Sequence, residues 1–486
     1  MIDIDFESKA SIGFRFVFDM MEADSPYGAE YIKKPPVYDE ASAGELETEL
    51  NNVERAIATF ADFKHDYSLI ERTMMTMKDI RKTLSHMREA SLDDVELFEL
   101  KRFLLQLERI APAYARLNEA ARFSGIEIAA DTEALDILDC DGTRTATFMI
   151  SDRMSDALKR IRDEKRGIEL KIRMSGSASE AERLKAERTV IAAREQEEEA
   201  RIRREITTRL EPHVKTIERY IDGIGRLDFT IARARLAMRF NAAKPSLGGE
   251  SVELVGMTNP MIAEALESRG KRFMPVSVRF ERGTTVITGA NMGGKSMSMK
   301  TAALNVLLAH CGMYVFAKSA KIPYFDGMHI VAEDMEDSRR GLSSFGAEIV
   351  ELSKTVELAR GERRSLIILD ELARGTNPDE GARIVQGTVK SLSRLNAVSV
   401  LTTHYDGVAQ FATKHYRVVG LKNIDERLMK ERIAARGESG VSVIEDCMDY
   451  RLEEMDGECP VPQDALKICE MLSIDGELLD DIRGAY

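Results

Sequence analysis

The run GANMGGKS combines residue types that can bind phosphate. Gly289, Gly294, Lys295 and Ser296 match the spacing G-x4-G-K-[ST]. Glycines allow successive backbone N–H groups to point into one concavity, and a helix N-terminus adds partial positive charge. Lys295 would then reach the β- and γ-phosphates of a nucleotide, and the Ser296 hydroxyl would bind Mg²⁺. The run therefore predicts a site for ATP and Mg²⁺.

Two carboxylates follow the apolar run SLIIL, which we expect to be a buried strand. In open α/β sheets, ligands bind at the carboxyl ends of the strands. Asp370 would hold Mg²⁺ through water, and Glu371 would orient and deprotonate the attacking water. The alternative is a pair of surface carboxylates without a catalytic role.

His404 ends a second apolar run that finishes in TTH. We expect it to sense the γ-phosphate, with a structural histidine as the alternative. We assign Lys295, Glu371 and His404 to catalysis, and Ser296 and Asp370 to the metal. The residues predicted to bind the nucleotide are Gly289, Asn291, Met292, Gly293, Gly294, Lys295, Ser296, Met297 and Phe273.

Short β-rich runs alternate with helical stretches after Pro245. This alternation predicts a mostly parallel sheet with helices on both faces, which would bring the motifs to one edge. The expected strands are Val276–Phe280, Thr285–Thr288, Leu366–Leu369 and Ala397–Thr402.

The chain before about residue 245 has helical spacing. One apolar face contains Leu97, Leu100, Phe103, Leu104, Leu107, Ile110 and Ala111. Pro35 and Pro36 mark a break, and helical periodicity resumes from Glu45 to Phe60. A second stripe contains Ile202, Ile206, Leu210, Ile217, Ile221 and Ile224, and Pro212 should kink or divide its helix.

Residues 153–205 are rich in charge and in helix-favouring residues, with MSGSAS as the turn signal. We predict a long antiparallel helical hairpin with its tip near Gly176. It contains 15 Lys and Arg against 12 Asp and Glu, a net charge of +3 in a chain of net charge -14. The functional interpretation is an arm that touches an anionic partner. The alternative is a solvated coiled coil held by ion pairs.

The composition indicates a globular protein of several domains. Of 486 residues, 44% are hydrophobic and 31% are charged, and no apolar run is long enough to span a membrane. The five cysteines are scattered and suggest neither a disulfide framework nor a zinc site. We expect a cytoplasmic protein without a secretory signal. The acidic balance speaks against a wholly basic, nucleic-acid-binding surface but leaves room for a local basic groove.

Together these motifs resemble those of the MutS-type ATPases of the ABC superfamily. The family patterns correspond to GANMGGKSM, LDELARGT and LTTHYD, and RRGLSSFGAEI resembles the signature G-x-S-T-F-x-x-E. More weakly, DSPYGAEYIKKP and GRLDFTIARARLA resemble the opening and closing of the family's core domain. The residues before and into the hairpin resemble the MutS paralogue that carries an Smr nuclease-like domain.

The resemblance implies a dimer in which the signature of one subunit completes the nucleotide site of the other. Gly341, Ser343 and Ser344 would then face a γ-phosphate bound by Lys295 of the second subunit. Hydroxyl donors suit this role because they stabilise phosphate charge. Closure of the ATPase domains would move the hairpin as a pair of levers.

The sequence also departs from the family. Ala290 and Met297 stand where Pro and Thr are usual, and Ser344 replaces Thr. We find no mismatch-reading domain before the core, no β-rich clamp between the levers and no Smr domain. We therefore expect a compact MutS-like protein.

The predicted fold class is α plus α/β, with a helical core and an ABC-type P-loop ATPase domain. The expected parts are a helical core at 1–150, a charged lever hairpin at 151–210, a helical return at 211–245, a MutS-type ATPase domain at 246–420, and a C-terminal tail at 421–486 that packs on the ATPase or dimer interface.

Two functions remain open at this point. The first is an ATP-gated dimer acting on duplex or branched DNA, or on RNA. The alternative is a protein-remodelling ATPase, similar to the ATPase component of reactivating factors for cobalamin-dependent lysine or ornithine aminomutases. A degenerate, inactive homologue is a third interpretation. We expect a homodimer, or a heterodimer with a related subunit, and no membrane partner.

Overall fold

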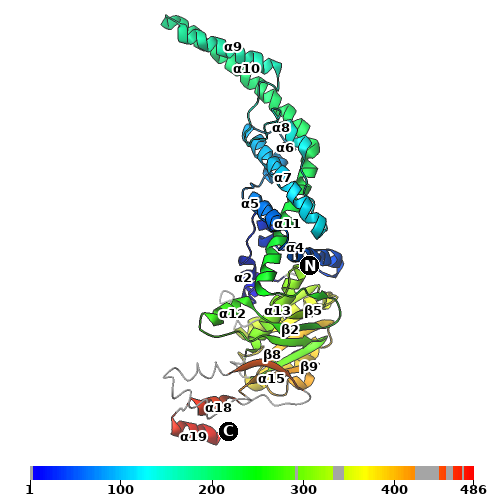
Figure 1. Cartoon of the computed structure of the whole chain (residues 1–486). Coiled ribbons are helices and arrows are strands. Elements are labelled where there is room, and N and C mark those ends of the chain that lie inside the picture. Colours follow the sequence, from blue (N-terminus) through cyan, green and yellow to red (C-terminus); the bar gives the residue numbers. More distant parts are fainter. Residues whose placement is uncertain are drawn as a thin grey trace. The chain divides into compact units, whose positions relative to one another are not determined.

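The computed structural model of the chain describes residues 4–289, 294–331, 344–421, 448–455, 464–472 and 475–485 (Figure 1). The chain forms two compact units. The first contains Met1–Met21, Pro35–Glu54 and Arg233–Tyr486, and the second contains Glu22–Lys34 and Arg55–Ala232. The five-part domain division made from the sequence stays a prediction.

The second unit is built from helices in the described chain. Helix α7 (Asp94–Ala121) buries most of the apolar face that its spacing predicted, and a capping box of Asp93 and Glu96 starts it. Helices α4 (Ala43–Thr59) and α11 (Val214–Phe240) contain residues of both units. The remaining helices are α3 (Pro26–Lys33), α5 (Lys64–Met74), α6 (Arg81–Met87), α7 (Asp94–Ala121), α8 (Thr132–Leu138), α9 (Asp156–Met174), α10 (Ala178–Leu210) and the 3-10 turn η2 (Glu211–His213).

Helices α9 and α10 lie side by side and antiparallel (Figure 1). The turn between them covers residues 175–177, and the Ser177 side chain accepts a hydrogen bond from the Glu180 N–H at the start of α10. A narrow apolar seam joins the helices through Ile161, Ile168, Leu184 and Ile191. Ion pairs cross the seam on its flanks: Arg162 with Glu195 and Glu199, Lys165 with Glu195, Arg188 with Glu169, and Arg194 with Glu164.

Pro212 separates helix α10 from helix α11, as expected for a residue that lacks the N–H needed to continue a helix. Helix α10 ends at Leu210, η2 contains the proline, and α11 begins at Val214. The predicted isoleucine and leucine stripe is buried on both sides of this break.

The first unit contains two sheets. The larger has the order β10-β9-β4-β8-β7-β6, and its neighbours are parallel except for β10 and β9. Its strands are β4 (Gly283–Thr288), β6 (Gly327–Val331), β7 (Ser365–Leu369), β8 (Ala397–Thr403), β9 (Lys414–Gly420) and β10 (Asp449–Glu454). The mixed helical and α/β fold is confirmed.

One expected strand was assigned to the wrong sheet. Val276–Phe280 is strand β3, but it lies in a smaller sheet of order β1-β5-β2-β3, antiparallel to β2. Its residues alternate between buried and exposed, which suits an antiparallel strand with one covered face. The other strands of this sheet are β1 (Ser246–Leu247), β2 (Val252–Met257) and β5 (Ser319–Ile322).

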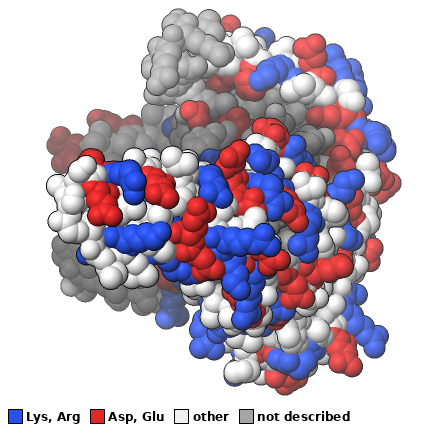
Figure 2. Space-filling view, turned by 90° about the horizontal axis from the view of Figure 1, so that it is seen from above, with Lys and Arg blue, Asp and Glu red and all other residues white. Residues whose placement is uncertain are grey.

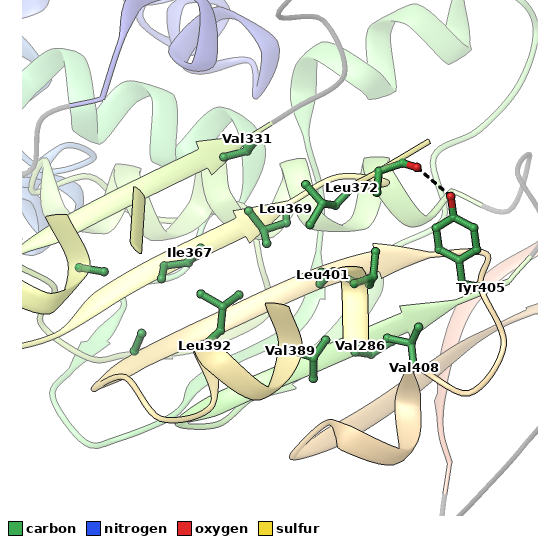
Figure 3. Close-up of a cluster of buried hydrophobic side chains, with 14 residues drawn as sticks. Val286, Val331, Ile367, Leu369, Leu372, Val389, Leu392, Leu401, Tyr405 and Val408 are labelled. Atoms are coloured by element: carbon green, nitrogen blue, oxygen red, sulfur yellow. Dashed lines mark hydrogen bonds between the residues drawn. The ribbon is translucent and has the colours of Figure 1, made fainter. Parts of the chain in front are cut away.

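Helices cover both faces of the larger sheet. On one face, Ile367 and Leu369 of β7 pack with Val385 and Val389 of helix α15 (Pro378–Leu392) (Figure 3). On the other face, Leu366 and Ile368 lie among apolar side chains of α13 (Lys295–His310) and the smaller sheet. The first unit's helices and turns are α1 (Phe6–Ser11), α2 (Phe14–Asp19), η1 (Glu40–Ser42), α12 (Pro260–Glu267), α13 (Lys295–His310), α14 (Ser344–Gly361), α15 (Pro378–Leu392), η3 (Ala409–Phe411), α18 (Asp464–Met471) and α19 (Gly476–Ala485).

Among the described helices, none combines the length and apolar composition that crossing a bilayer requires.

His310, the last residue of α13, predicts a pH dependence of stability. Its side chain is fully buried; Nδ1 donates to the Val306 carbonyl at 2.9 Å, and Nε2 accepts from the Phe325 N–H at 3.1 Å. A second ring proton would meet a donor instead of an acceptor. Burial lowers the pKa of His310 from 6.5 to about 4, partly opposed by the Val306 carbonyl.

Because the unfolded chain binds this proton more readily, stability is present above pH 6.5 and is lost as the pH falls toward 4. The full change should be about 3 kcal/mol. Urea denaturation of wild type and of His310→Leu between pH 7.5 and 4.5 measures it. The variant should lack this component, whereas exposed His65→Ala should keep it. Parallel pH profiles for wild type and His310→Leu would show that the buried imidazole contributes nothing.

Candidate active site

The predicted phosphate-binding motif lies between a strand and a helix, as its sequence context indicated. Strand β4 ends at Thr288, and α13 begins at Lys295, directly after Gly294. The Lys295 ammonium is buried and donates to the carbonyl of Gly289 at 2.8 Å. The lysine therefore lies at the start of the loop whose backbone would surround phosphate.

Asp370 gathers two hydroxyl groups at the carboxyl ends of the strands. The Ser296 hydroxyl donates to Asp370 Oδ1 at 2.8 Å, and the Thr402 hydroxyl donates to the same oxygen at 2.8 Å. The Asp370 N–H donates to the carbonyl of Val331 at 2.9 Å. These bonds place a carboxylate and a hydroxyl, both hard oxygen donors, side by side.

The Glu371 carboxylate lies beside the Lys295 ammonium. Its Oε1 lies 3.3 Å from Lys295 Nζ, and its Oε2 lies 3.6 Å from a guanidinium nitrogen of Arg374. Its backbone N–H donates to the Thr402 hydroxyl at 3.0 Å. Burial lowers the pKa of Lys295, and the charge and hydrogen bond of Glu371 partly oppose that shift.

A cavity of about 340 Å³ opens beside Gly294. Among the residues predicted to bind nucleotide, Phe273, Gly294 and Met297 line it, as do Met448 and Tyr450 of the C-terminal region. Gly294 has a φ of 78° and an added Cβ would lie 2.9 Å from a ring carbon of Tyr450, so this position requires glycine. The structure thus brings an aromatic residue from before β3 and another from β10 to the motif.

His404 follows β8, where the sequence predicted it. Its ring lies 4.3 Å from the Tyr405 ring, measured between centroids, at 40°. Its Nδ1 is buried without a hydrogen-bond partner in the described chain. In the described part of the chain, the His404 side chain makes no hydrogen bond to Lys295, Asp370 or Glu371. Its role as a γ-phosphate sensor stays a prediction.

Several predicted residues lie outside the described chain: Asn291, Met292 and Gly293 of the loop, and Gly341 and Ser343 of the signature. Ser344 is described only as the first residue of α14.

Sequence reasoning missed residues that hold this site together. Thr402 is buried and bonded to both Asp370 and Glu371, and the only signal was a hydroxyl near the end of the run before His404. Met448 and Tyr450 reach the cavity although they are far along the chain from the motif. Their contribution depends on β10 pairing with β9, which no short motif indicated.

Comparison with known proteins agrees with this geometry. Residues 285–436 match the family model of MutS domain V. This part of the chain is a MutS domain V. The chain is 31% identical over 232 residues to the Endonuclease MutS2 of Pelotomaculum thermopropionicum, covering 47% of this chain and 28% of that protein.

Two further relatives are similar. The Endonuclease MutS2 of Thermus thermophilus is 30% identical over 219 residues, which are 45% of this chain and 28% of that protein. The DNA mismatch repair protein MutS of Fusobacterium nucleatum is 28% identical over 221 residues, 45% of this chain and 24% of that protein. The match thus spans 28% of the length of each of these MutS2 proteins and 24% of the length of the MutS protein. It supports the predicted family, and the matched range 285–436 contains Lys295, Asp370, Glu371 and His404.

Proposed function

We propose that this chain binds ATP with Mg²⁺ and hydrolyses it at Lys295, Ser296, Asp370 and Glu371. The observation that carries the proposal is the bonded arrangement of these four side chains at the ends of β4 and β7. ATP hydrolysis needs a cation for phosphate, oxygen ligands for the metal and a carboxylate for the attacking water. The four residues supply all three.

The residues present fit both groups. Ser296 Oγ and Asp370 Oδ1 lie 2.8 Å apart, so the Ser296 hydroxyl would bind Mg²⁺ and Asp370 would hold it through water. The cavity beside Gly294 offers Phe273, Met297 and Tyr450, whose aromatic and thioether groups suit the face of a purine. When bound, Mg²⁺ and ATP supply the phosphoryl group and the metal charge that stabilises its oxygens.

The roles of the side chains follow from their contacts. Lys295 neutralises phosphate charge, and Ser296 and Asp370 hold the metal. Glu371 orients water and takes its proton. Because Lys295 contacts Glu371 in the structure, bound phosphate would compete for the lysine and leave the carboxylate to water.

The proposed enzyme is a homodimer, with a heterodimer with a related subunit as the alternative. The signature residues Gly341, Ser343 and Ser344 of one subunit would complete the site of the other. The family resemblance supports this arrangement. Closure of two ATPase domains would move the α9–α10 hairpin as a pair of levers.

We propose that DNA is the partner of these levers. The relatives carry names that concern DNA, endonuclease and mismatch repair. In the hairpin, some exposed cations make no ion pair within the described residues, namely Lys159, Arg160, Lys171, Arg173, Arg183 and Arg204. In Figure 2, Lys and Arg alternate with Asp and Glu over the face in view, so we expect a modest set of phosphate contacts. The alternative, a protein-remodelling ATPase, finds no support in these relatives.

Phosphate release from ATP tests the enzymatic proposal. The purified chain should hydrolyse ATP in the presence of Mg²⁺, and Lys295→Ala should not. Duplex and branched DNA should change the rate through the levers. A rate equal to that of Lys295→Ala under all these conditions would remove the proposed activity.

Neutralising the tip of the hairpin should weaken DNA binding. Lys171, Arg173 and Arg183 lie near the turn between α9 and α10, and each phosphate contact adds about 0.9 to the slope of log affinity against log salt. The triple alanine variant should lower this slope by about 3, measured by fluorescence anisotropy of a labelled duplex. The matched control replaces exposed Lys64, Arg282 and Arg394 by alanine. Equal slopes in the two triple variants would show that the hairpin does not hold phosphate.

A further inference from the structure

We infer that Glu348 and Tyr405 are positioning residues that hold the backbone after Asp370 from two sides and so place the Glu371 carboxylate for hydrolysis. The inference rests on the proposed ATP hydrolysis and gives a role to two side chains that stand in the motifs RRGLSSFGAEI and LTTHYD without an assigned function. Both lie in the first compact unit with the site.

The backbone that carries Glu371 is strained. Glu371 has a φ of 49° and Ala373 a φ of 65°, both in the left-handed region although neither is glycine. Residues with a Cβ avoid this region, so a segment with two of them persists only where its surroundings enforce it. The position of the Glu371 side chain therefore depends on what holds this segment.

Two side chains hold the peptide groups on either side of Ala373. Its N–H donates to Glu348 Oε2 at 3.0 Å, and its carbonyl accepts from the Tyr405 hydroxyl at 2.8 Å. Figure 3 shows this hydroxyl directed at the segment that follows Leu372, while Leu372 itself packs in the buried cluster. With Thr402 on the N–H of Glu371, hydrogen bonds fix the segment at both strained residues.

The tyrosine has little freedom to move. It is 8% exposed, and a Cβ at position 381 would overlap its hydroxyl, so α15 packs closely against it. Burial raises the pKa of Tyr405, as do the nearby charges of Glu348 and Glu371. The phenol therefore keeps its proton and remains a donor to the Ala373 carbonyl.

These bonds link the Glu371 segment to two other parts of the proposed site. Glu348 belongs to α14, which begins at the predicted signature residue Ser344. Tyr405 directly follows His404. A shift of either element on nucleotide binding would thus reach the general base through one residue, Ala373, without touching the groups that bind phosphate.

Conservative variants test the inference. Tyr405→Phe removes one hydroxyl, and Glu348→Ala removes one acceptor. Each should lower kcat about tenfold, the effect of losing one buried hydrogen bond in the transition state, and leave the Kd for a fluorescent ATP analogue within about twofold. Glu348→Gln keeps an acceptor oxygen and should restore most of the rate. The double variant should lose little more than the worse single one, because both act through Ala373.

Two comparisons isolate the mechanism. Tyr416→Phe loses a hydroxyl that is bonded to the backbone of Arg279, outside the site, and should keep the wild-type kcat. In a Glu371→Gln background, Tyr405→Phe should cause no further loss. An active wild type whose kcat is unchanged by both Tyr405→Phe and Glu348→Ala, or lowered only through weaker nucleotide binding, overturns the inference alone. A wild type that hydrolyses no ATP overturns the proposed function and this inference with it.

Discussion

Glu371→Gln is expected to lower the kcat for ATP by about 10²–10⁴-fold, the usual contribution of a general base. The amide keeps the size of the side chain and cannot accept a proton from water. Nucleotide should still bind, because Lys295 and the Ser296–Asp370 pair are unchanged, and the contact between Lys295 and residue 371 would weaken. The variant should therefore accumulate ATP in a closed dimer, measured by single-turnover hydrolysis and gel filtration.

Glu380→Gln is the matched control for this change. Glu380 lies exposed in the first turn of α15, and the same loss of charge there should leave kcat within about twofold. If Glu371→Gln hydrolyses ATP at the wild-type rate, another group takes the proton and our assignment of the general base is wrong.

Glu49→Ala is expected to destabilise the first unit by about 3–5 kcal/mol, the cost of leaving a buried charge without its partner. Glu49 of α4 forms an ion pair with Arg233 of α11, and the two side chains are 7% and 0% exposed. Arg233 also donates to the carbonyl of Gly312 at 3.0 Å. The loss should appear as a lower urea midpoint, and replacing both residues by Met should recover much of it.

A second ion pair between the same two stretches of chain provides the control. Lys244 contacts Glu54 at 2.6 Å, but Glu54 is 58% exposed. Glu54→Ala should cost less than about 1 kcal/mol, since water already solvates both charges. Equal losses in the two variants would show that burial is not what makes the Glu49–Arg233 pair important.

Much of the site could be predicted because local spacing places its residues. A strand, a glycine-rich turn and a helix bring Lys295 and Ser296 to one edge, and the apolar run before Asp370 makes another strand of the same sheet, separated from β4 by β8. In an open α/β sheet, ligands bind at the carboxyl ends of the strands, so carboxylates that directly follow buried strands are expected at the site. The break at Pro212 and the turn between α9 and α10 were predictable for the same reason: they depend on neighbouring residues along the chain.

Other features depend on contacts between distant segments. β3 has a strand composition, yet its sheet is decided by β2, which hydrogen-bonds it, and not by its own residues. Thr402 and Tyr405 have ordinary residue types for their places in the chain, and the signature run that contains Glu348 does not say what this carboxylate contacts. They matter because the order of strands and helices brings them to the segment after Asp370.

The residues proposed to carry the chemistry are therefore predictable from short stretches of sequence, whereas the contacts that position them are not. Residue type and spacing alone predict the phosphate loop, the proposed metal ligands and the proposed general base, because each belongs to a short run with its own backbone requirement. The strained segment around Glu371, the hydrogen bonds that hold it, and the approach of Tyr450 to Gly294 arise only when β4, β7, β8 and β10 share one sheet. Packing between segments far apart in the chain decides these contacts, so a pattern of neighbouring residues does not predict them.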